Sequence, residues 1–193
     1  EMVREDLPLV WEWFDYRRGV VAGCEPNAAH YAITRAQRSN KFHSFTLVTQ
    51  NIDGLHRTAG SADVIELHGN IHQARCLSCG FLQDLGYIPE DERPPICPEC
   101  LDSMRPNVVL FGEALDEDGL LEAYEKSAAC DVCLVVGTSA VVYPANQIPR
   151  IAKREGATVI EINPDATEIT NSVDISIRGK AAEILPTLFN DGV

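Results

Sequence analysis

The sequence lacks a long apolar run, since no hydrophobic stretch approaches the roughly 20 residues that a membrane-spanning helix needs. It also lacks a signal-peptide pattern at its start, internal repeats and low-complexity segments. Basic residues are scarce: 16 Lys and Arg stand against 29 Asp and Glu, which gives a net charge of −13. A chain with this charge is not expected to bind nucleic acid or anionic membranes non-specifically. We therefore expect an intracellular protein with basic partners, of undefined oligomeric state.

The remaining composition predicts a globular protein, because 193 residues with 45% apolar content suffice for one domain with a small satellite. The segment 7–18 predicts an amphipathic helix that ends at Gly19. Its apolar positions are Leu9, Val10, Trp13 and Phe14. Core packing is the simplest interpretation of these aromatic residues and of Trp11. A second helix is predicted over 26–39, with small apolar residues on one face.

Strands alternate with helices or loops along the rest of the chain. The predicted strands are 44–49, 64–67, 107–111, 132–136, 158–162 and 173–177. Their alternation with helices, and their apolar character on both faces, predict an α/β fold with a Rossmann-like, doubly wound parallel sheet. Between His72 and Arg105 the pattern changes to cysteine, proline and charge, which indicates a small separate module.

Polar residues follow the predicted strands just past their carboxyl ends. These residues are Gln50 and Asn51, His68, Gly137-Thr138-Ser139 and Asn163. Open α/β sheets bind ligands at that edge, so the sequence predicts a ligand crevice there. The Gly-Thr-Ser triplet offers hydroxyl and backbone N–H groups to a phosphate or a ribose.

Four of the seven cysteines form two CxxC pairs separated by 17 residues. They are Cys76, Cys79, Cys97 and Cys100. This spacing favours zinc over the disulfides of a small secreted domain. Four thiolates leave no coordination position for water, so we expect one structural zinc ion. Cys130 and Cys133 lie in or beside an apolar run and are interpreted as buried, reduced thiols.

These patterns predict four regions along the chain. They are a small-domain helix over 1–25, a first Rossmann-like part over 26–72, a zinc-binding module over 73–104 and a second Rossmann-like part over 105–193.

His68, Asn51 and Asp53 each have a structural alternative. A lone histidine is often a satisfied loop residue, and Asn-x-Asp-Gly is good turn chemistry. Because His68 stands at one predicted strand end and the amide and carboxylate at another, a functional role is favoured. An imidazole that titrates near neutrality can remove a proton from a hydroxyl. His56 and His72 lack that setting and are interpreted as structural.

Five motifs follow one another in the chain. They are Gln50-Asn51-Ile52-Asp53-Gly54, His68-Gly69, the two CxxC pairs, Gly137-Thr138-Ser139 and Ile162-Asn163-Pro164. In this order they resemble the sirtuin family of NAD-dependent protein deacylases, over residues 26–188. The likeness is greatest to the bacterial and mitochondrial branch that removes acidic acyl groups. It is carried by Tyr16-Arg17-Arg18, Glu25-Pro26-Asn27-Ala28, Arg105-Pro106 and Phe111-Gly112-Glu113.

The resemblance implies a protein-lysine deacylase that converts NAD and acyl-lysine to lysine, nicotinamide and O-acyl-ADP-ribose, in the cytoplasm or, alternatively, in mitochondria. It implies His68 as general base, with Asn51 and Asp53 positioning the nicotinamide ribose and its carboxamide. The residues implied to contact NAD are Gln50, Asn51, Asp53, Gly137, Thr138, Ser139, Asn163 and Ala181. An acyl-lysine protein or peptide would pair as a strand between the zinc module and the sheet. The residues implied to contact it are Phe14, Arg17, Phe111, Gly112, Glu113, Val141 and Tyr143.

The acyl preference depends on two of these residues. The resembling branch holds the carboxylate of succinyl- or malonyl-lysine with a Tyr-x-x-Arg pair, and Phe14 and Arg17 stand at the matching positions. A solvated surface charge is the alternative interpretation of Arg17. A charge-assisted pair outweighs the lost neutral hydrogen bond, which contributes about 0.5–1.5 kcal/mol. We therefore expect desuccinylase and demalonylase activity beside deacetylase activity.

The chain departs from the family in one respect. Sirtuins begin with a strand and a glycine-rich phosphate loop of Gly-Ala-Gly-x-Ser type, and these 193 residues do not contain it. A catalytically weak acyl-peptide binding module is therefore the alternative function. A zinc hydrolase is disfavoured, because its metal would need an open coordination position.

We predict that NAD binds this chain weakly, because only the triplet at 137–139 and the loop at 179–181 remain to hold the pyrophosphate. Titration calorimetry measures the affinity. A low-micromolar dissociation constant would show that the remaining groups suffice.

Overall fold

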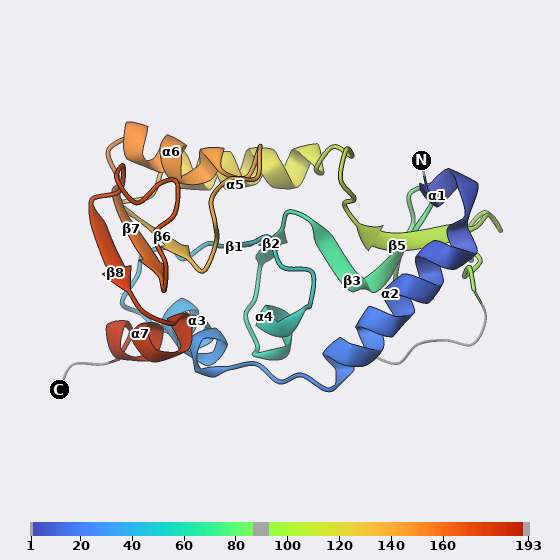
Figure 1. Ribbon diagram of the computed structural model, residues 1–193, viewed down its shortest axis with the longest axis horizontal. Helices are drawn as coiled ribbons and strands as arrows, with labels where there is room; N and C mark the ends of the chain where they lie inside the picture. Colours follow the sequence, from blue (N-terminus) through green and yellow to red (C-terminus); the bar gives the residue numbers. More distant parts are fainter. Residues whose placement is uncertain (1, 87–92, 191–193) are drawn as a thin grey trace. The chain divides into compact units, whose positions relative to one another are not determined.

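The computed structural model describes residues 2–86 and 93–190, which fall into two compact units (Figure 1). The described part of the first unit is 2–25, 51–54, 68–86 and 93–114, and that of the second is 26–50, 55–67 and 115–190. Three segments that the sequence assigned to the Rossmann-like parts, 51–54, 68–72 and 105–114, thus group with the cysteine module. Within the described ranges, no helix combines the length and the apolar character that crossing a bilayer requires.

The first unit packs two helices on a small antiparallel sheet. Its elements are α1 (Met2–Glu5), α2 (Leu7–Ala22), β3 (Gly69–Cys76), β4 (Leu82–Asp84) and β5 (Met104–Val108). The strand order is β4-β3-β5, and both neighbours of β3 run antiparallel to it.

The predicted strand 107–111 is wrong in its bounds and in its parallel setting, because the real strand β5 lies three residues earlier and pairs antiparallel with β3. Two features of the sequence hid this pairing. Strand β3 contains His, Gln and Arg, and Pro106 interrupts β5, so neither reads as an apolar run.

The buried face of α2 also differs from the predicted one. The residues that it buries are Val10, Trp11, Phe14 and Arg18. Leu9 and Trp13, predicted to face the core, are about half exposed, at 48% and 49%. The orientation of the helix is fixed by Trp11, which is fully buried and whose Nε1–H donates to the Met104 carbonyl at 2.9 Å. Gly19 does not end the helix, which runs on to Ala22.

Two apolar clusters attach α2 to the sheet. Trp11 packs with Cys76 and Cys97 of the cysteine module, and Phe14 packs with Ile71 and Val108 of the strands. The helix therefore joins the cysteine module and the start of β3 into one body.

The second unit is an α/β layer structure, which confirms the predicted fold class. Its helices are α3 (Ala28–Arg38), α4 (Leu55–Thr58), α5 (Glu117–Ala128), α6 (Gln147–Arg154) and α7 (Ala181–Leu188). Its strands are β1 (Leu47–Thr49), β2 (Val64–Glu66), β6 (Val132–Val136), β7 (Thr158–Asn163) and β8 (Ile175–Arg178). All pairings are parallel, as β1-β2 and as β6-β7-β8, so the chain forms two parallel sheets where one was expected.

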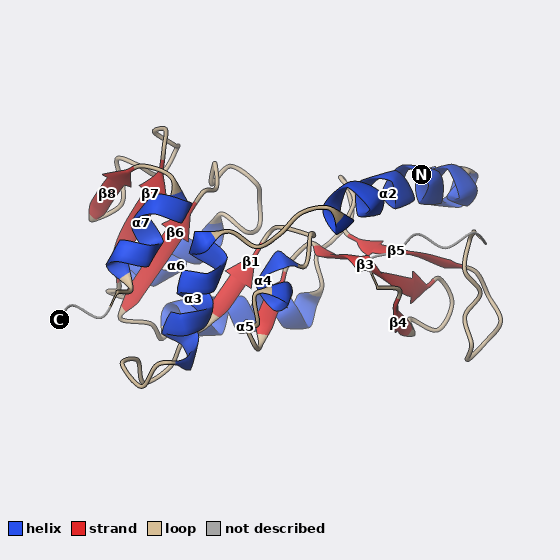
Figure 2. Cartoon of the chain, turned by 90° about the horizontal axis from the view of Figure 1, so that it is seen from below, coloured by secondary structure: helices blue, strands red, loops and turns tan. Residues whose placement is uncertain are grey.

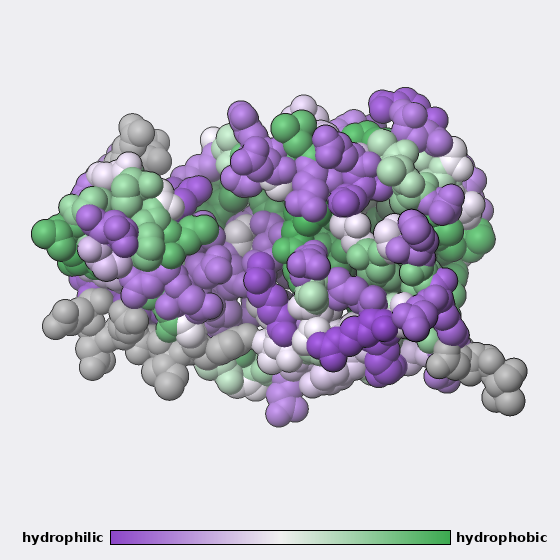
Figure 3. All heavy atoms as spheres, turned by 180° about the vertical axis from the view of Figure 1, so that it is seen from behind, coloured by the Kyte–Doolittle hydropathy of each residue, from purple (hydrophilic) through white to green (hydrophobic). Residues whose placement is uncertain are grey.

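Helices cover both faces of β6-β7-β8, with α3 and α7 on one side and α6 on the other (Figure 2), whereas α5 packs against β2. Alternation along β7 explains this arrangement. Ile160 and Ile162 pack against Ala32 of α3 and Leu185 of α7, whereas Val159 belongs to the cluster around α6. Hydrophilic side chains cover much of the face drawn in Figure 3, in keeping with the net charge of −13.

Candidate functional site

An open pocket of about 660 Å³ lies at the carboxyl ends of β6 and β7 in the second unit. It is lined by Gly137, Thr138, Ser139, Val141, Asn163, Asp165, Ala166, Thr167 and Glu168. The predicted ligand crevice is therefore present, and the Gly-Thr-Ser triplet and Asn163 meet in it.

Three strand ends are tied together at this pocket by side-chain hydrogen bonds. The Gln50 amide, just after β1, donates to the Thr138 hydroxyl at 3.3 Å, and the Asn163 amide donates to the Thr138 carbonyl at 3.0 Å. Gly137 has φ +61°, a left-handed conformation that favours glycine, and its N–H donates to the Ile162 carbonyl. The turn after β6 is thus fixed against β7, with the residues that follow it lining the pocket.

The stretch 165–168 lines the pocket and was missed by the sequence analysis. Its only sequence signal is its place directly after the Asn163-Pro164 strand end. The stretch adds two acidic residues, Asp165 and Glu168, and Thr167 to the residues that line the pocket. The pocket is therefore polar and partly acidic, a setting that suits the hydroxyl donors of a ribose.

Ala181, predicted to contact the same ligand, begins α7 and packs against the apolar cluster of Ile162 and Leu185. It is not among the pocket-lining residues of the described chain.

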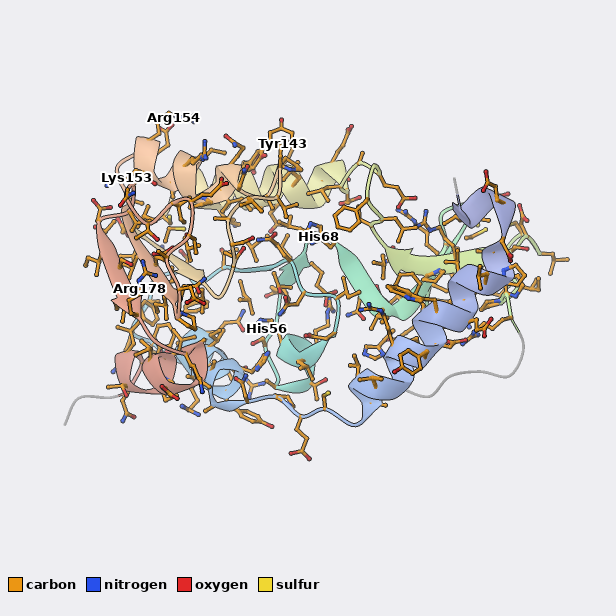
Figure 4. The ribbon with its side chains drawn as sticks, in the orientation of Figure 1. His56, His68, Tyr143, Lys153, Arg154 and Arg178 are labelled. Atoms are coloured by element: carbon orange, nitrogen blue, oxygen red, sulfur yellow. The ribbon has the colours of Figure 1, made fainter. Side chains whose placement is uncertain are left out.

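Asn51, Asp53 and His68 all lie in the first unit, where two short segments meet. The Ile71 N–H donates to the Ile52 carbonyl at 2.8 Å, so the segment 51–54 rests on the start of β3. His68 directly precedes β3 (Figure 4), and its carbonyl accepts the Val109 N–H at 2.9 Å. The structure thus gathers the three predicted catalytic residues at one end of this sheet.

Gly69, next to His68, is required by its neighbours. Its φ is +78°, and a Cβ at this position would lie 2.0 Å from the Asn107 carbonyl oxygen. Only glycine permits β3 and β5 to approach this closely, and this approach fixes the backbone that carries His68.

His72, interpreted as structural, is buried and lies between two carbonyl oxygens. Its Nε2 is 3.0 Å from the Asp53 oxygen, and its Nδ1 is 3.2 Å from the Gly86 oxygen. The ring therefore links the segment that carries Asp53 to the chain after β4. The ring of His56, in the second unit, contacts that of His30 at a centroid distance of 4.7 Å.

The two residues predicted to select the acyl group face different surroundings on α2. Phe14 is 3% exposed, inside the cluster with Ile71 and Val108. Arg17 is exposed, and its guanidinium carbon stands 3.9 Å above the ring of Trp13. A hydroxyl added to Phe14 would be buried in an apolar cluster, whereas Arg17 keeps an accessible charge.

The predicted peptide-contact segment 111–113 is a turn in the structure, with Gly112 at φ +87°. Phe111 is fully exposed. The Glu113 carboxylate accepts from Arg105 at 2.5 and 3.0 Å and from the Leu110 N–H. Burial alone would raise the pKa of Glu113, but these donors hold it below its usual value. The carboxylate therefore shapes the turn.

In the second unit, Val141 and Tyr143 belong to an irregular segment before α6. Both are exposed, and Tyr143 points outward (Figure 4). The segment is not a β-strand, and the carbonyls of Val141 and Val142 accept hydrogen bonds from Asn146.

The four predicted zinc ligands form one cluster, with all four sulfur atoms within 4.8 Å of one another. The Cys76 and Cys100 sulfurs are 3.3 Å apart, and those of Cys79 and Cys97 are 3.6 Å apart. Tetrahedral zinc with bonds of about 2.3 Å places its sulfurs about 3.8 Å from each other. The donor set therefore fits one zinc ion, held as a closed structural site.

Backbone groups favour the thiolate of one cysteine in this cluster. The Cys79 N–H lowers the pKa of the Cys76 thiol to about 6, with help from the Ser78 N–H and against the effect of burial. Against the lowering effect of the Asp102 N–H, the neighbouring Cys76 sulfur and burial raise the pKa of the Cys100 thiol to about 12.

Outside the cluster, burial raises the pKa of the Cys130 thiol and raises that of Cys133 to about 12. Both are free thiols, as predicted, but they are only partly buried and not fully buried as expected.

Comparisons with known proteins show which family the chain resembles. The Sir2 family profile matches residues 1–144. An "NAD-dependent protein deacylase" of Aquifex aeolicus is 47% identical over 182 residues, which cover 94% of this chain and 75% of that protein. One of Pseudomonas aeruginosa, "NAD-dependent protein deacylase 1", is 44% identical and covers 95% of this chain and 76% of its own length.

Two solved structures share the fold. A Sir2 homologue in complex with NAD has a TM-score of 0.89 and 41% identity, and the match covers 97% of this chain and 72% of that chain. A Sir2 protein bound to an acetylated peptide has a TM-score of 0.78 and 32% identity, over 88% and 71% of the two chains.

We predict that zinc stabilises the first unit. Replacing Cys97 by Ser should abolish zinc retention and lower the melting temperature, because Cys97 is also packed against Trp11. The readouts are metal content and thermal unfolding, with Cys24→Ser, an exposed thiol, as the control. Unchanged unfolding after strong chelation of the wild-type chain would contradict a structural zinc.

Proposed function

The chain belongs to the Sir2 family. We propose that it acts as an NAD-dependent protein-lysine deacylase through the residues at the carboxyl ends of β6 and β7 and those beside the start of β3. The observation that carries this proposal is the polar pocket at 137–139 and 163–168, joined to β1 through Gln50. Relatives of more than 40% identity carry the name of this activity, and a solved homologue of the same fold binds NAD.

NAD, when bound, supplies a ribose carbon that accepts the acyl oxygen as nicotinamide leaves. The pocket residues bind its nucleotide part: the hydroxyls of Thr138, Ser139 and Thr167 and the amide of Asn163 offer donors and acceptors to ribose and phosphate oxygens. The positive φ of Gly137 turns the backbone so that this triplet follows β6 at the pocket. These residues orient the co-substrate and take no part in proton transfer.

His68 is the proton acceptor in this proposal. As a neutral imidazole it would take the proton of a ribose hydroxyl, so that the hydroxyl oxygen could attack the former carbonyl carbon of the acyl group. Asn51 and Asp53 hold the nicotinamide ribose and carboxamide in place. The bond of Val109 to the His68 carbonyl and the close approach at Gly69 keep the backbone of the base rigid.

Zinc has no place in the reaction itself. Four thiolates complete its coordination, so it polarises neither water nor substrate, and removal of NAD should abolish activity completely. A zinc hydrolase would keep its activity without NAD.

A non-catalytic acyl-peptide binding module is the competing function. Release of nicotinamide from NAD in the presence of an acetyl-lysine peptide separates the two, because binding alone leaves NAD intact. Mass spectrometry of the peptide detects the second product, the peptide with its free lysine.

We further propose that the acyl groups removed include succinyl and malonyl. The support is Arg17, an accessible guanidinium kept in place by the Trp13 ring. A cation over an aromatic face is restrained without losing its charge, so it can pair with an acyl carboxylate.

Replacing His68 by Ala should lower nicotinamide release by about 10²–10⁴-fold, the usual effect of losing a general base. The melting temperature should be unchanged, because the ring is only partly buried. His43→Ala, which removes an exposed histidine, is the control. Turnover of His68→Ala near that of the wild type would remove His68 from the mechanism.

Replacing Arg17 by Met should lower kcat/KM for a succinyl-lysine peptide about 10- to 100-fold and spare the acetyl-lysine peptide, because only the former carries a carboxylate. Arg150→Met, at an exposed arginine of α6, is the matched control. If the ratio of kcat/KM for the two substrates is unchanged in Arg17→Met, the proposed activity is limited to deacetylation.

A further inference from the structure

A buried carboxylate lies beneath the nucleotide pocket. Glu161 is on β7, two residues before Asn163, and is 1% exposed. A charged group taken out of water is costly unless hydrogen bonds and an opposite charge replace its hydration. Its surroundings meet this requirement. The donors to its two oxygens are the hydroxyls of Thr167, Thr170 and Ser176 and the guanidinium of Arg178, at 3.0 Å.

Most of these donors belong to, or also bind, the loop that follows β7. Thr167 lines the pocket. Thr170 does not line it, but its hydroxyl oxygen accepts the Thr167 N–H at 2.8 Å. Arg178 extends from β8 (Figure 4) and also donates to the Asp165 carbonyl at 2.6 Å. The Glu161 carboxylate is therefore the common centre to which the pocket-lining loop is attached.

The charge of Glu161 also sets the direction of the hydrogen bonds around it. Burial would raise the pKa of Glu161, but the hydroxyls of Thr167, Thr170 and Ser176 and the charge of Arg178 hold it below its usual value. An ionised carboxylate only accepts, so the Thr167 hydroxyl must use its proton toward Glu161. Toward all other groups the Thr167 hydroxyl oxygen is then an acceptor, and it accepts the Ile169 N–H at 3.3 Å.

We propose that Glu161 is a positioning residue for the nucleotide part of NAD. It holds the loop 165–170 in the shape of the pocket wall and presents Thr167 as an acceptor for a ribose hydroxyl. This inference rests on the proposed use of NAD and concerns a residue that does not itself line the pocket. Glu161 acts through Thr167, Thr170 and Arg178.

The test compares Glu161→Gln with the wild type in calorimetry with ADP-ribose, which fills the pocket without any reaction. The dissociation constant should rise about tenfold or more, as expected when a hydrogen-bonded charge is lost. In nicotinamide release, KM for NAD should rise while kcat and KM for the peptide stay the same. Amide hydrogen exchange over 165–170 should become faster in the variant.

Asp174→Asn is the matched control. Asp174 pairs with Lys153 and accepts the Val159 N–H at 2.9 Å, so it is also an acidic partner of β7, but at the opposite end of the strand. ADP-ribose binding and loop exchange should be unchanged in this variant, because nothing that it holds lines the nucleotide pocket.

A second pair of variants covers the case in which Glu161→Gln fails to fold. Thr170→Val leaves every pocket-lining residue in place but removes one donor to Glu161 and the acceptor of the Thr167 N–H, and it should weaken ADP-ribose binding and speed loop exchange. Thr170→Ser keeps the hydroxyl and should bind as the wild type does.

Three results would overturn the inference. The first is that Glu161→Gln binds ADP-ribose as tightly as the wild type although its thermal stability has fallen. If Glu161→Gln does not fold, the same result for Thr170→Val counts. The second is equal weakening by Thr170→Val and Thr170→Ser. The third is a wild-type chain whose loop 165–170 gains no exchange protection from ADP-ribose. Failure of the proposed function would appear separately, as absence of nicotinamide release by a chain that binds ADP-ribose.

Discussion

The parallel pairing of β6 with β7 is the constraint on which the pocket depends. Its register sets Val136 opposite Ile162, so that both strands end together and the Gly137 N–H reaches the Ile162 carbonyl. Everything polar at this edge follows from that alignment. A shift of one residue would turn Ile162 out of the apolar cluster with Ala32 and Leu185, so the core enforces the register that the pocket needs.

Buried charges occur in both units, and each stabilises irregular backbone. Arg18, fully buried on α2, donates to Asp15 and to the carbonyls of Leu85 and Gly86. In the second unit, the Glu161 carboxylate fixes the loop after β7, but as an acceptor of hydrogen bonds where Arg18 is a donor. Loops lack the internal hydrogen bonds of helices and strands, so an ionised side chain with several partners is an efficient way to fix their shape. Of these two loops, the one after β7 borders the predicted residue Asn163 and lines the pocket.

The first unit has a small apolar core, and zinc and α2 together supply stability that a larger core would otherwise provide. Its sheet has three short strands, and its apolar interior is built around Trp11, Phe14 and the cysteine residues. A small sheet of this kind gains much of its stability from a metal cross-link, because the core that it can bury is limited. The cysteine module therefore supports the backbone at His68 indirectly, through β3, which begins at Gly69 and ends at Cys76.

The sequence by itself determined the α/β class, the four sulfur ligands and the polar residues at the strand ends, since each depends on spacing along the chain. Apolar runs such as Val132–Val136 read directly as parallel strands, and two CxxC pairs 17 residues apart have the spacing of a zinc site. The tertiary structure decided the rest. It rotated α2 so that Trp11 and Arg18 face inward, paired β5 antiparallel with β3, and placed 165–168 in the pocket wall. Hydrophobic periodicity could not reveal these features. Two of them depend on a partner distant in sequence, the Met104 carbonyl for Trp11 and the close contact at Asn107 for Gly69, and the loop depends on hydrogen bonds to the Glu161 carboxylate, which apolar patterns do not register.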